Sequence, residues 1–196
     1  MWVDGLGHLP GQLVVVSGPS GCGKSSVIRS ALEGGGLNAR LSVSATTRAP
    51  RPGELEGVDY EFMSVDAFLA YRDEGRFLEW AEYNGNSYGT PKKTVYETLA
   101  TGKSVILEIE VHGALLVREQ SPTALFVFIK TPTFRVLEER LRHRGTETEA
   151  VILRRLRTAR KELAEAHWYD HQIVNDDFDA CVEQFTRLLS DSGCGG

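Results

Sequence analysis

Short apolar runs alternate along this chain with longer segments in which apolar residues recur at helical spacing. The runs are rich in β-branched residues and predict buried strands at residues 12–17, 104–109, 125–129 and 172–174. Helical spacing predicts helices at residues 26–32, 64–75, 93–100, 134–142, 149–165 and 178–189. Buried strands that alternate with helices indicate an α/β fold in which helices wrap a parallel sheet.

Residues 43–93 depart from that alternation, because short strands, turns and aromatic side chains replace the long apolar runs. Two prolines and a glycine exclude a continuous helix or a central strand from the basic stretch 46–54. Short strands are predicted at residues 39–44, 59–63, 77–83 and 87–91, with a hairpin turn at Asn84-Gly85. We expect an inserted lobe that carries a second site, and we expect residues 1–11 to be loose and residues 190–196 to be disordered.

A glycine-rich loop separates the first predicted strand from the first predicted helix. Its sequence, Gly18-Pro19-Ser20-Gly21-Cys22-Gly23-Lys24-Ser25, has the form G-x-x-x-x-G-K-[ST], and Ser26 follows it. The glycines allow successive backbone N–H groups to converge on an anion, and the helix N-terminus adds partial positive charge. We expect Lys24 to reach the β- and γ-phosphates of a nucleotide, and the Ser25 hydroxyl to hold Mg²⁺. A chance glycine loop is the alternative, and both flanking elements disfavour it.

The overall charge sets a condition on any anion site. The 196 residues carry a formal net charge of −5, so neither nucleic acid nor a membrane is an expected partner, and an anionic ligand needs a local cluster of Arg and Lys. The three cysteines are scattered without metal-ligand spacing, which favours a reducing compartment. Without a secretory signal or an apolar run of membrane-spanning length, we expect a cytoplasmic protein of one domain.

Motifs outside the glycine loop strongly resemble those of the guanylate kinase family. They are the stretch 42–54 with Gly57 and residues 59–62, then Glu79-Trp80-Ala81, Tyr88-Gly89-Thr90, residues 144–148 and residues 173–177. The resemblance implies a three-layer P-loop NTPase fold with a core at residues 12–42, 94–132 and 159–189, a mixed α/β GMP-binding lobe at 43–93 and a helical lid at 133–158. It also implies an ATP:GMP phosphotransferase of purine nucleotide metabolism, which transfers the γ-phosphoryl of ATP to GMP, and to dGMP, with Mg²⁺.

Two arginines lie three positions apart in the proline-stiffened part of this motif. The guanidinium groups of Arg48 and Arg51 can grip one phosphate bidentately, although the spacing alone fits a solvated basic turn equally well. The resemblance assigns both arginines, with Tyr60 and Tyr88, to the phosphate of GMP.

One carboxylate is implied to read the base. The resemblance assigns Glu79 to the N1–H and 2-amino donors of guanine, with the hydroxyls of Ser44 and Thr90 near O6. Adenine has an acceptor at N1 and no 2-amino group, so it would leave a buried carboxylate unpaired at a large cost in affinity. Without the resemblance, Glu79 would be interpreted as an exposed carboxylate on a strand.

Two further glutamates follow a predicted strand. Acidic residues near that position meet Mg²⁺ or nucleotide in P-loop enzymes, although many relatives carry Asp where this chain has Glu108 and Glu110. We expect Glu108 to contact the metal through water, and Glu110 to face GMP.

The resemblance also places residues on the ATP side. It assigns Arg140, Arg144 and Arg155 to a lid that brings positive charge to the transferred phosphoryl group. It assigns Asn175 to the adenine side of ATP. Without it, the arginines would be interpreted as surface residues paired with glutamates, and Asn175 as part of a helix cap.

Two other functions are weighed against this one. A guanylate-kinase-like scaffold domain that binds peptides is expected to lack an intact glycine loop, whereas Lys24 and Ser25 are both present here. A kinase of similar fold that acts on a phosphorylated sugar would not need the guanine set of Ser44, Glu79 and Thr90. The sequence is compatible with either a monomer or a homo-oligomer.

Overall fold

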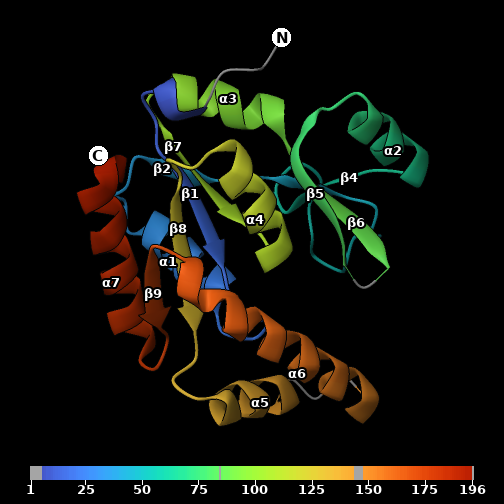
Figure 1. Cartoon of the computed structure of the whole chain (residues 1–196), viewed down its shortest axis with the longest axis vertical. Coiled ribbons are helices and arrows are strands. Elements are labelled where there is room, and N and C mark those ends of the chain that lie inside the picture. The colour runs from blue at the N-terminus through green and yellow to red at the C-terminus, as the bar shows by residue number, and fades with distance from the viewer. Residues whose placement is uncertain (1–5, 84, 144–147, 196) are drawn as a thin grey trace.

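A parallel sheet lies at the centre of the molecule (Figure 1). The computed structural model describes residues 6–83, 85–143 and 148–195. Within these residues the strand order is β2 (Ala39–Leu41), β7 (Ser104–Glu108), β1 (Leu13–Ser17), β8 (Leu125–Lys130) and β9 (His171–Val174), and each neighbouring pair is parallel. The predicted α/β fold with a parallel sheet is confirmed.

Helices cover both faces of this sheet, because successive side chains of a strand point to opposite sides. Val14 and Val16 of β1 pack in one apolar cluster with α1 and α7, whereas Leu13 and Val15 pack in a second cluster with α3 and α4. These helices are α1 (Lys24–Glu33), α3 (Lys92–Ala100), α4 (Val111–Gln120) and α7 (Phe178–Leu189). The result is three layers, as expected.

Helix α4 is absent from the elements predicted by the sequence. Glycine in its first turn disfavours a helix, and its N-terminus is capped by a glutamate rather than by Ser, Thr, Asp or Asn. The two carboxylate oxygens of Glu110 accept the N–H groups of His112 and Gly113, both at 2.8 Å. These features give no local helix signal, which explains why the pattern misses this element.

The residues between β2 and α3 form the expected lobe, which has a second sheet. Its strands occur in the order β4 (Tyr60–Phe62), β3 (Ser44–Thr46), β6 (Asn86–Pro91) and β5 (Phe77–Tyr83), with α2 (Val65–Asp73) in the same lobe. The single strand predicted at residues 39–44 is wrong, because β2 belongs to the central sheet and β3 to the lobe. The packed side chains of Ala45, Phe68 and Phe77 give the lobe its own small core. The predicted turn residue Asn84 lies outside the described residues.

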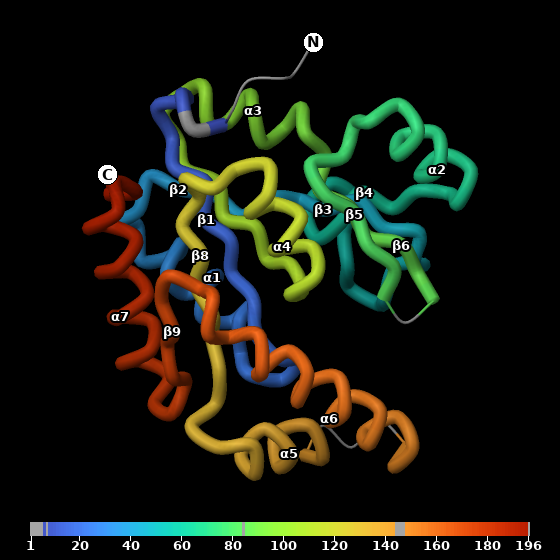
Figure 2. Tube along the Cα trace, in the orientation of Figure 1, coloured from blue at the N-terminus to red at the C-terminus, as the bar shows by residue number. Residues whose placement is uncertain are grey.

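Two helices extend below the sheet in the view of Figure 2. They are α5 (Phe134–His143) and α6 (Glu149–Ala164), and α6 runs back to the core, where it continues into a 3₁₀ turn at Glu165–Trp168. Leu137 of α5 and Leu156 of α6 are buried in the cluster that contains β1 and α1. The two helices of the segment that is expected to act as a lid therefore pack on the same core that supports the glycine loop.

Both ends of the described chain are more ordered than expected. Leu6 is buried in the core, within a 3₁₀ turn at Leu6–His8. Disorder at residues 190–196 is a wrong prediction for Ser190–Cys194, which adds a further turn after α7. Cys194 is fully buried, and its carbonyl oxygen accepts the N–H of Asn38 at 2.8 Å. In the described ranges, no helix has the length and apolar character needed to cross a membrane.

Candidate active site

The glycine loop (residues 18–25) follows β1 and leads into α1, as predicted. Gly18 has a φ of 145°, and a Cβ there would lie 1.9 Å from the carbonyl oxygen of Ile129, so only glycine fits. Lys24 Nζ donates to the carbonyl oxygens of Gly18 at 2.6 Å and Pro19 at 3.3 Å, which folds the ammonium group back over the loop. Cys22 is fully buried, and burial raises the pKa of its thiol, so this side chain fills space rather than reacting.

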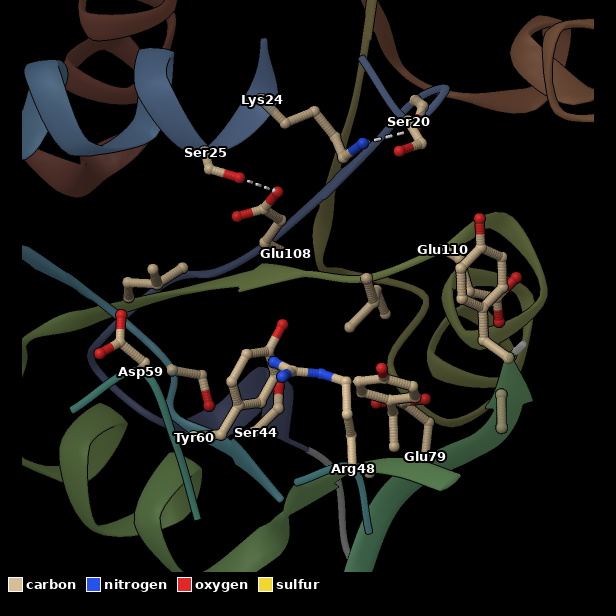
Figure 3. A pocket seen from close by; sticks show the side chains of 18 of the residues that line it. Ser20, Lys24, Ser25, Ser44, Arg48, Asp59, Tyr60, Glu79, Glu108 and Glu110 are labelled. Atoms are coloured by element: carbon tan, nitrogen blue, oxygen red, sulfur yellow. Dashed lines mark hydrogen bonds between the residues drawn. The ribbon is translucent and has the colours of Figure 1, made fainter. Parts of the chain in front are cut away.

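A cavity of about 380 Å³ lies in front of this loop (Figure 3). Residues of the loop and residues of the lobe face each other across it, although they are far apart in the sequence. The loop and the start of α1 contribute Gly18, Ser20, Lys24 and Ser25, the lobe contributes Ser44, Arg48, Arg51, Tyr60, Glu79 and Tyr88, and the end of β7 and the residues after it contribute Glu108 and Glu110. Residues predicted for the two sites therefore line one cavity.

The other predicted residues lie outside this lining. They are Pro19, Gly21, Cys22, Gly23, Ser26, Thr90, Arg140, Arg155 and Asn175. Arg155 nevertheless donates to Ser20 Oγ at 2.5 Å, and Arg140 donates to the Cys22 carbonyl oxygen at 3.4 Å, so both arginines reach the glycine loop. Arg144 lies outside the described residues.

Arg48 is held in one orientation by Glu54. Its two terminal nitrogens donate to the two carboxylate oxygens at 3.0 and 2.9 Å, and the same carboxylate accepts the N–H of Arg51 at 2.7 Å. These hydrogen bonds, that of Arg48 first, lower the pKa of Glu54. The guanidinium carbon lies 5.2 Å from the ring centroid of Tyr60, which packs edge-on to Tyr88 at 6.0 Å. Arg48 therefore belongs to an ordered cluster and not to a solvated turn.

Glu79 is a buried carboxylate, with only 7% of its surface exposed. It lies on β5, and Thr90 of the neighbouring β6 donates its hydroxyl to Glu79 Oε1 at 2.6 Å. Burial raises the pKa of Glu79 to about 7; the Thr90 hydrogen bond opposes the rise and the charge of Glu110 adds to it. The interpretation of Glu79 as an exposed strand carboxylate is wrong.

A hydroxyl and a carboxylate meet beside the glycine loop. Ser25 Oγ donates to Glu108 Oε1 at 2.7 Å (Figure 3). Oxygen donors of this kind suit Mg²⁺, which usually keeps several waters and binds one or two protein groups plus substrate phosphates. Among the described residues, no group of three or more His, Cys, Asp or Glu side chains could hold a metal by itself. Ser25 and Glu108 thus fit a metal that arrives with a nucleotide.

The cavity also contains residues to which the sequence analysis assigns no role. Glu162 of α6 is in the lining; burial raises the pKa of its carboxyl, and the charge of Lys24 lowers it. Glu162 follows Arg155 by seven positions, about two helical turns, so the two share one face of α6. The spacing of seven residues from Arg155 is the sequence signal that could have identified Glu162. Asp59 lines the cavity as well, and its carboxylate accepts the N–H of Leu55 at 2.8 Å.

Comparison with known proteins agrees with this geometry. The family model described as guanylate kinase matches residues 10–192. The chain belongs to the guanylate kinase family. The guanylate kinase of Rubrobacter xylanophilus is 50% identical over 186 residues, which cover 95% of this chain and 97% of that relative. The guanylate kinase of Gloeobacter violaceus is 52% identical over 184 residues, which cover 93% and 89%.

A solved structure extends the likeness to the fold. The crystal structure of guanylate kinase from Anaplasma phagocytophilum superposes with a TM-score of 0.76 at 33% sequence identity, covering 93% of this chain and 86% of that one. The resemblance inferred from the motifs is confirmed, and so is the P-loop fold. Guanylate kinases are ATP:GMP phosphotransferases, so the glycine loop and the facing lobe are the parts that such a reaction needs.

Proposed function

We propose that this member of the guanylate kinase family transfers the γ-phosphoryl group of ATP to GMP and to dGMP. The observation that carries the proposal is the single cavity whose lining combines the glycine loop with Arg48, Arg51 and Glu79. One side offers backbone N–H groups and Lys24 to a triphosphate, and the other offers guanidinium groups to a monophosphate. Phosphoryl transfer depends on bringing these two anions together in alignment, and this lining supports it.

The attack needs no general base. The attacking atom is a phosphate oxygen of GMP, and the second pKa of a phosphate monoester is about 6, so this oxygen is largely ionised at neutral pH. The obstacle is the repulsion between two polyanions. We assign Arg48, Arg51, Tyr60 and Tyr88 to the GMP phosphate. Because Glu54 already orients the guanidinium group of Arg48, this side chain loses less conformational entropy when the phosphate of GMP binds.

On the donor side, we assign the backbone of residues 18–26 and Lys24 to the phosphates of ATP. Lys24 would exchange its contacts with loop carbonyl oxygens for contacts with phosphate oxygens. We assign Arg140 and Arg155 to the γ-phosphoryl group, because both already reach the glycine loop. Arg144 is assigned to the same lid from the family motif.

Mg²⁺ is the proposed cofactor, bound together with ATP. Ser25 and Glu108 would hold it, Glu108 directly or through water. When bound, it supplies charge neutralisation to the β- and γ-phosphates.

Guanine selectivity rests on Glu79. As a carboxylate it can accept both the N1–H and the 2-amino group, while Thr90 keeps one of its oxygens in place. Ser44 and Glu110 share the lining with Glu79 and are assigned to the base as well. Adenine would leave unpaired the acceptor positions of the buried carboxylate that guanine fills, which is the basis of discrimination.

An assay of ADP release with GMP, dGMP, AMP, CMP and UMP as acceptors tests this function. We expect turnover of GMP and dGMP, and at least about 100-fold lower kcat/KM for AMP. Equal turnover of AMP would overturn the guanine assignment. Glu79→Gln is expected to raise the KM for GMP far more than the KM for ATP. Glu82→Gln is the matched control, because Glu82 lies exposed on the same strand.

Binding measurements separate the two alternatives from this function. Intact Lys24 and Ser25 in the lining support an enzyme rather than a peptide-binding scaffold. Calorimetric titration with ATP and then GMP is expected to show binding of both. A scaffold that has lost catalysis would bind no ATP, and a sugar-phosphate kinase would bind ATP without GMP.

A further inference from the structure

The residue after β9 is buried against the glycine loop and does not line the cavity. Asn175 is 4% exposed, and its Nδ2 donates to the carbonyl oxygen of Cys22 at 2.8 Å. Its backbone N–H donates to the carbonyl oxygen of Lys130, the last residue of β8, at 2.7 Å. Asn175 therefore connects the glycine loop to the central sheet.

The loop backbone is closely fitted to this side chain. Gly23 has a φ of 97°, and a Cβ there would lie 2.4 Å from Asn175 Nδ2. In a planar trans peptide the carbonyl group and the following N–H point in opposite directions. A Cys22 carbonyl that is held toward Asn175 therefore directs the N–H of Gly23 to the other side of the loop, where backbone N–H groups bind an anion.

The lid reaches the same peptide group. Arg140 of α5 donates to the carbonyl oxygen of Cys22 at 3.4 Å and to that of Asn175 at 3.0 Å. The Cys22 carbonyl thus accepts from an amide and from a guanidinium group. Asn175 thus bonds to the sheet through its backbone N–H, to the loop through its side-chain Nδ2, and to the lid through its carbonyl oxygen.

We propose that Asn175 is a positioning residue for the triphosphate: it fixes the Cys22–Gly23 peptide plane and so aims the N–H of Gly23 at the phosphates. Its side chain acts through the loop and does not act through the adenine base. This inference rests on the proposed ATP site. Mutation of Asn175 should therefore weaken the binding of a polyphosphate by a similar factor whether or not an adenine base is attached.

Calorimetry with Mg²⁺-tripolyphosphate, which has no base or sugar, distinguishes action through the glycine loop from a contact with the adenine base. Asn175→Asp keeps the shape of the side chain but puts an oxygen opposite the Cys22 carbonyl oxygen, and Asn175→Ala removes the amide altogether. Both variants are expected to bind Mg²⁺-tripolyphosphate and Mg²⁺-ATP about tenfold more weakly, or worse, by similar factors. GMP affinity is expected to stay within about twofold, because the GMP half of the cavity is untouched. Titration with GMP also counts the folded, binding-competent protein.

The matched control is Asn38→Ala, because Asn38 Nδ2 also donates to a backbone carbonyl oxygen, that of Gly102 at 3.2 Å, and Asn38 is absent from the cavity lining. It should leave all three affinities unchanged. Weaker ATP binding with unchanged tripolyphosphate binding would indicate an adenine contact and overturn the inference. Unchanged affinities, or equal loss of GMP binding in both Asn175 variants, would overturn it too. A wild-type protein that bound neither ATP nor GMP would instead refute the proposed function.

Discussion

Ionisation of the carboxyl group of Glu79 costs free energy, because the group is buried. Because its pKa is raised to about 7, about half of the free protein carries the protonated form at pH 7. A protonated carboxyl has a donor of its own and cannot accept both N–H groups of guanine in the same way. GMP should therefore select the ionised form.

We expect the affinity for GMP to fall up to about tenfold per pH unit below pH 7 and to level off above about pH 8. The sign follows from the proton that Glu79 must release before it can accept from guanine. Calorimetric titrations across this range, in two buffers of different ionisation enthalpy, measure both the affinity and the proton released.

The control for this pH dependence is Glu79→Gln, which has no proton to release. Its remaining pH dependence reports the phosphate of GMP, whose second pKa is about 6. If the wild-type protein and this variant gave parallel pH profiles, Glu79 would not be the titrating group.

Helices α5 and α6 carry two kinds of arginine. Arg155 of α6 donates to Ser20 of the glycine loop, whereas Arg142 of α5 pairs with Glu138 and Glu149 at the surface. Exposed ion pairs contribute little to stability. The ion pairs of Arg142 are therefore surface contacts outside the candidate site.

If Arg155 acts as proposed, Arg155→Ala should lower kcat at least about 100-fold with little change in GMP affinity, because it removes a positive charge that contacts the glycine loop. Arg142→Ala should leave kcat within about twofold and the melting temperature unchanged. Steady-state kinetics of the two variants measure the difference. Equal losses of kcat in both would mean that Arg155 acts only through the fold of the lid.

Elements are predictable from this sequence where local chemistry and burial agree. Strands β1, β7 and β8 are apolar runs buried on both faces, so their composition alone identifies them. Helix α4 depends instead on an uncommon cap by Glu110, the residue directly before it, and the turn at Ser190–Cys194 depends on the distant Asn38, whose N–H donates to the Cys194 carbonyl oxygen. A pattern of apolar positions contains no information about either contact.

The candidate site divides in the same way. The motifs and the family resemblance identify Lys24, Arg48 and Glu79, because each residue type is tied to a chemical task. That Glu54 holds Arg48 and that Asn175 holds the Cys22 carbonyl are three-dimensional facts. The burial of Glu79 reverses what its strand position suggests, because the neighbouring strand and α4 cover it.

The whole molecule consists of a central core and a lobe with a core of its own. Ala45, Phe68 and Phe77 pack together, separate from the two clusters that hold the parallel sheet. Leu78 of β5 is the exception, since it packs in the cluster of α4, and its carbonyl oxygen accepts from Gln120 at 2.8 Å. A lobe with its own core, which meets the central core mainly where β5 packs on α4, is the kind of unit that can move as a body.

Phosphoryl transfer to GMP rather than to water requires an active site from which water is excluded. We therefore expect the lobe to close over the cavity when both nucleotides are bound. Small-angle X-ray scattering should give a smaller radius of gyration with GMP and a nonhydrolysable ATP analogue together than with either alone. In Arg48→Ala, the part of this decrease in the radius of gyration that depends on GMP should be lost. The phosphate of GMP would then no longer draw the lobe toward the glycine loop. An unchanged radius in the wild-type protein with both ligands would mean that side chains in the cavity exclude water without movement of the lobe.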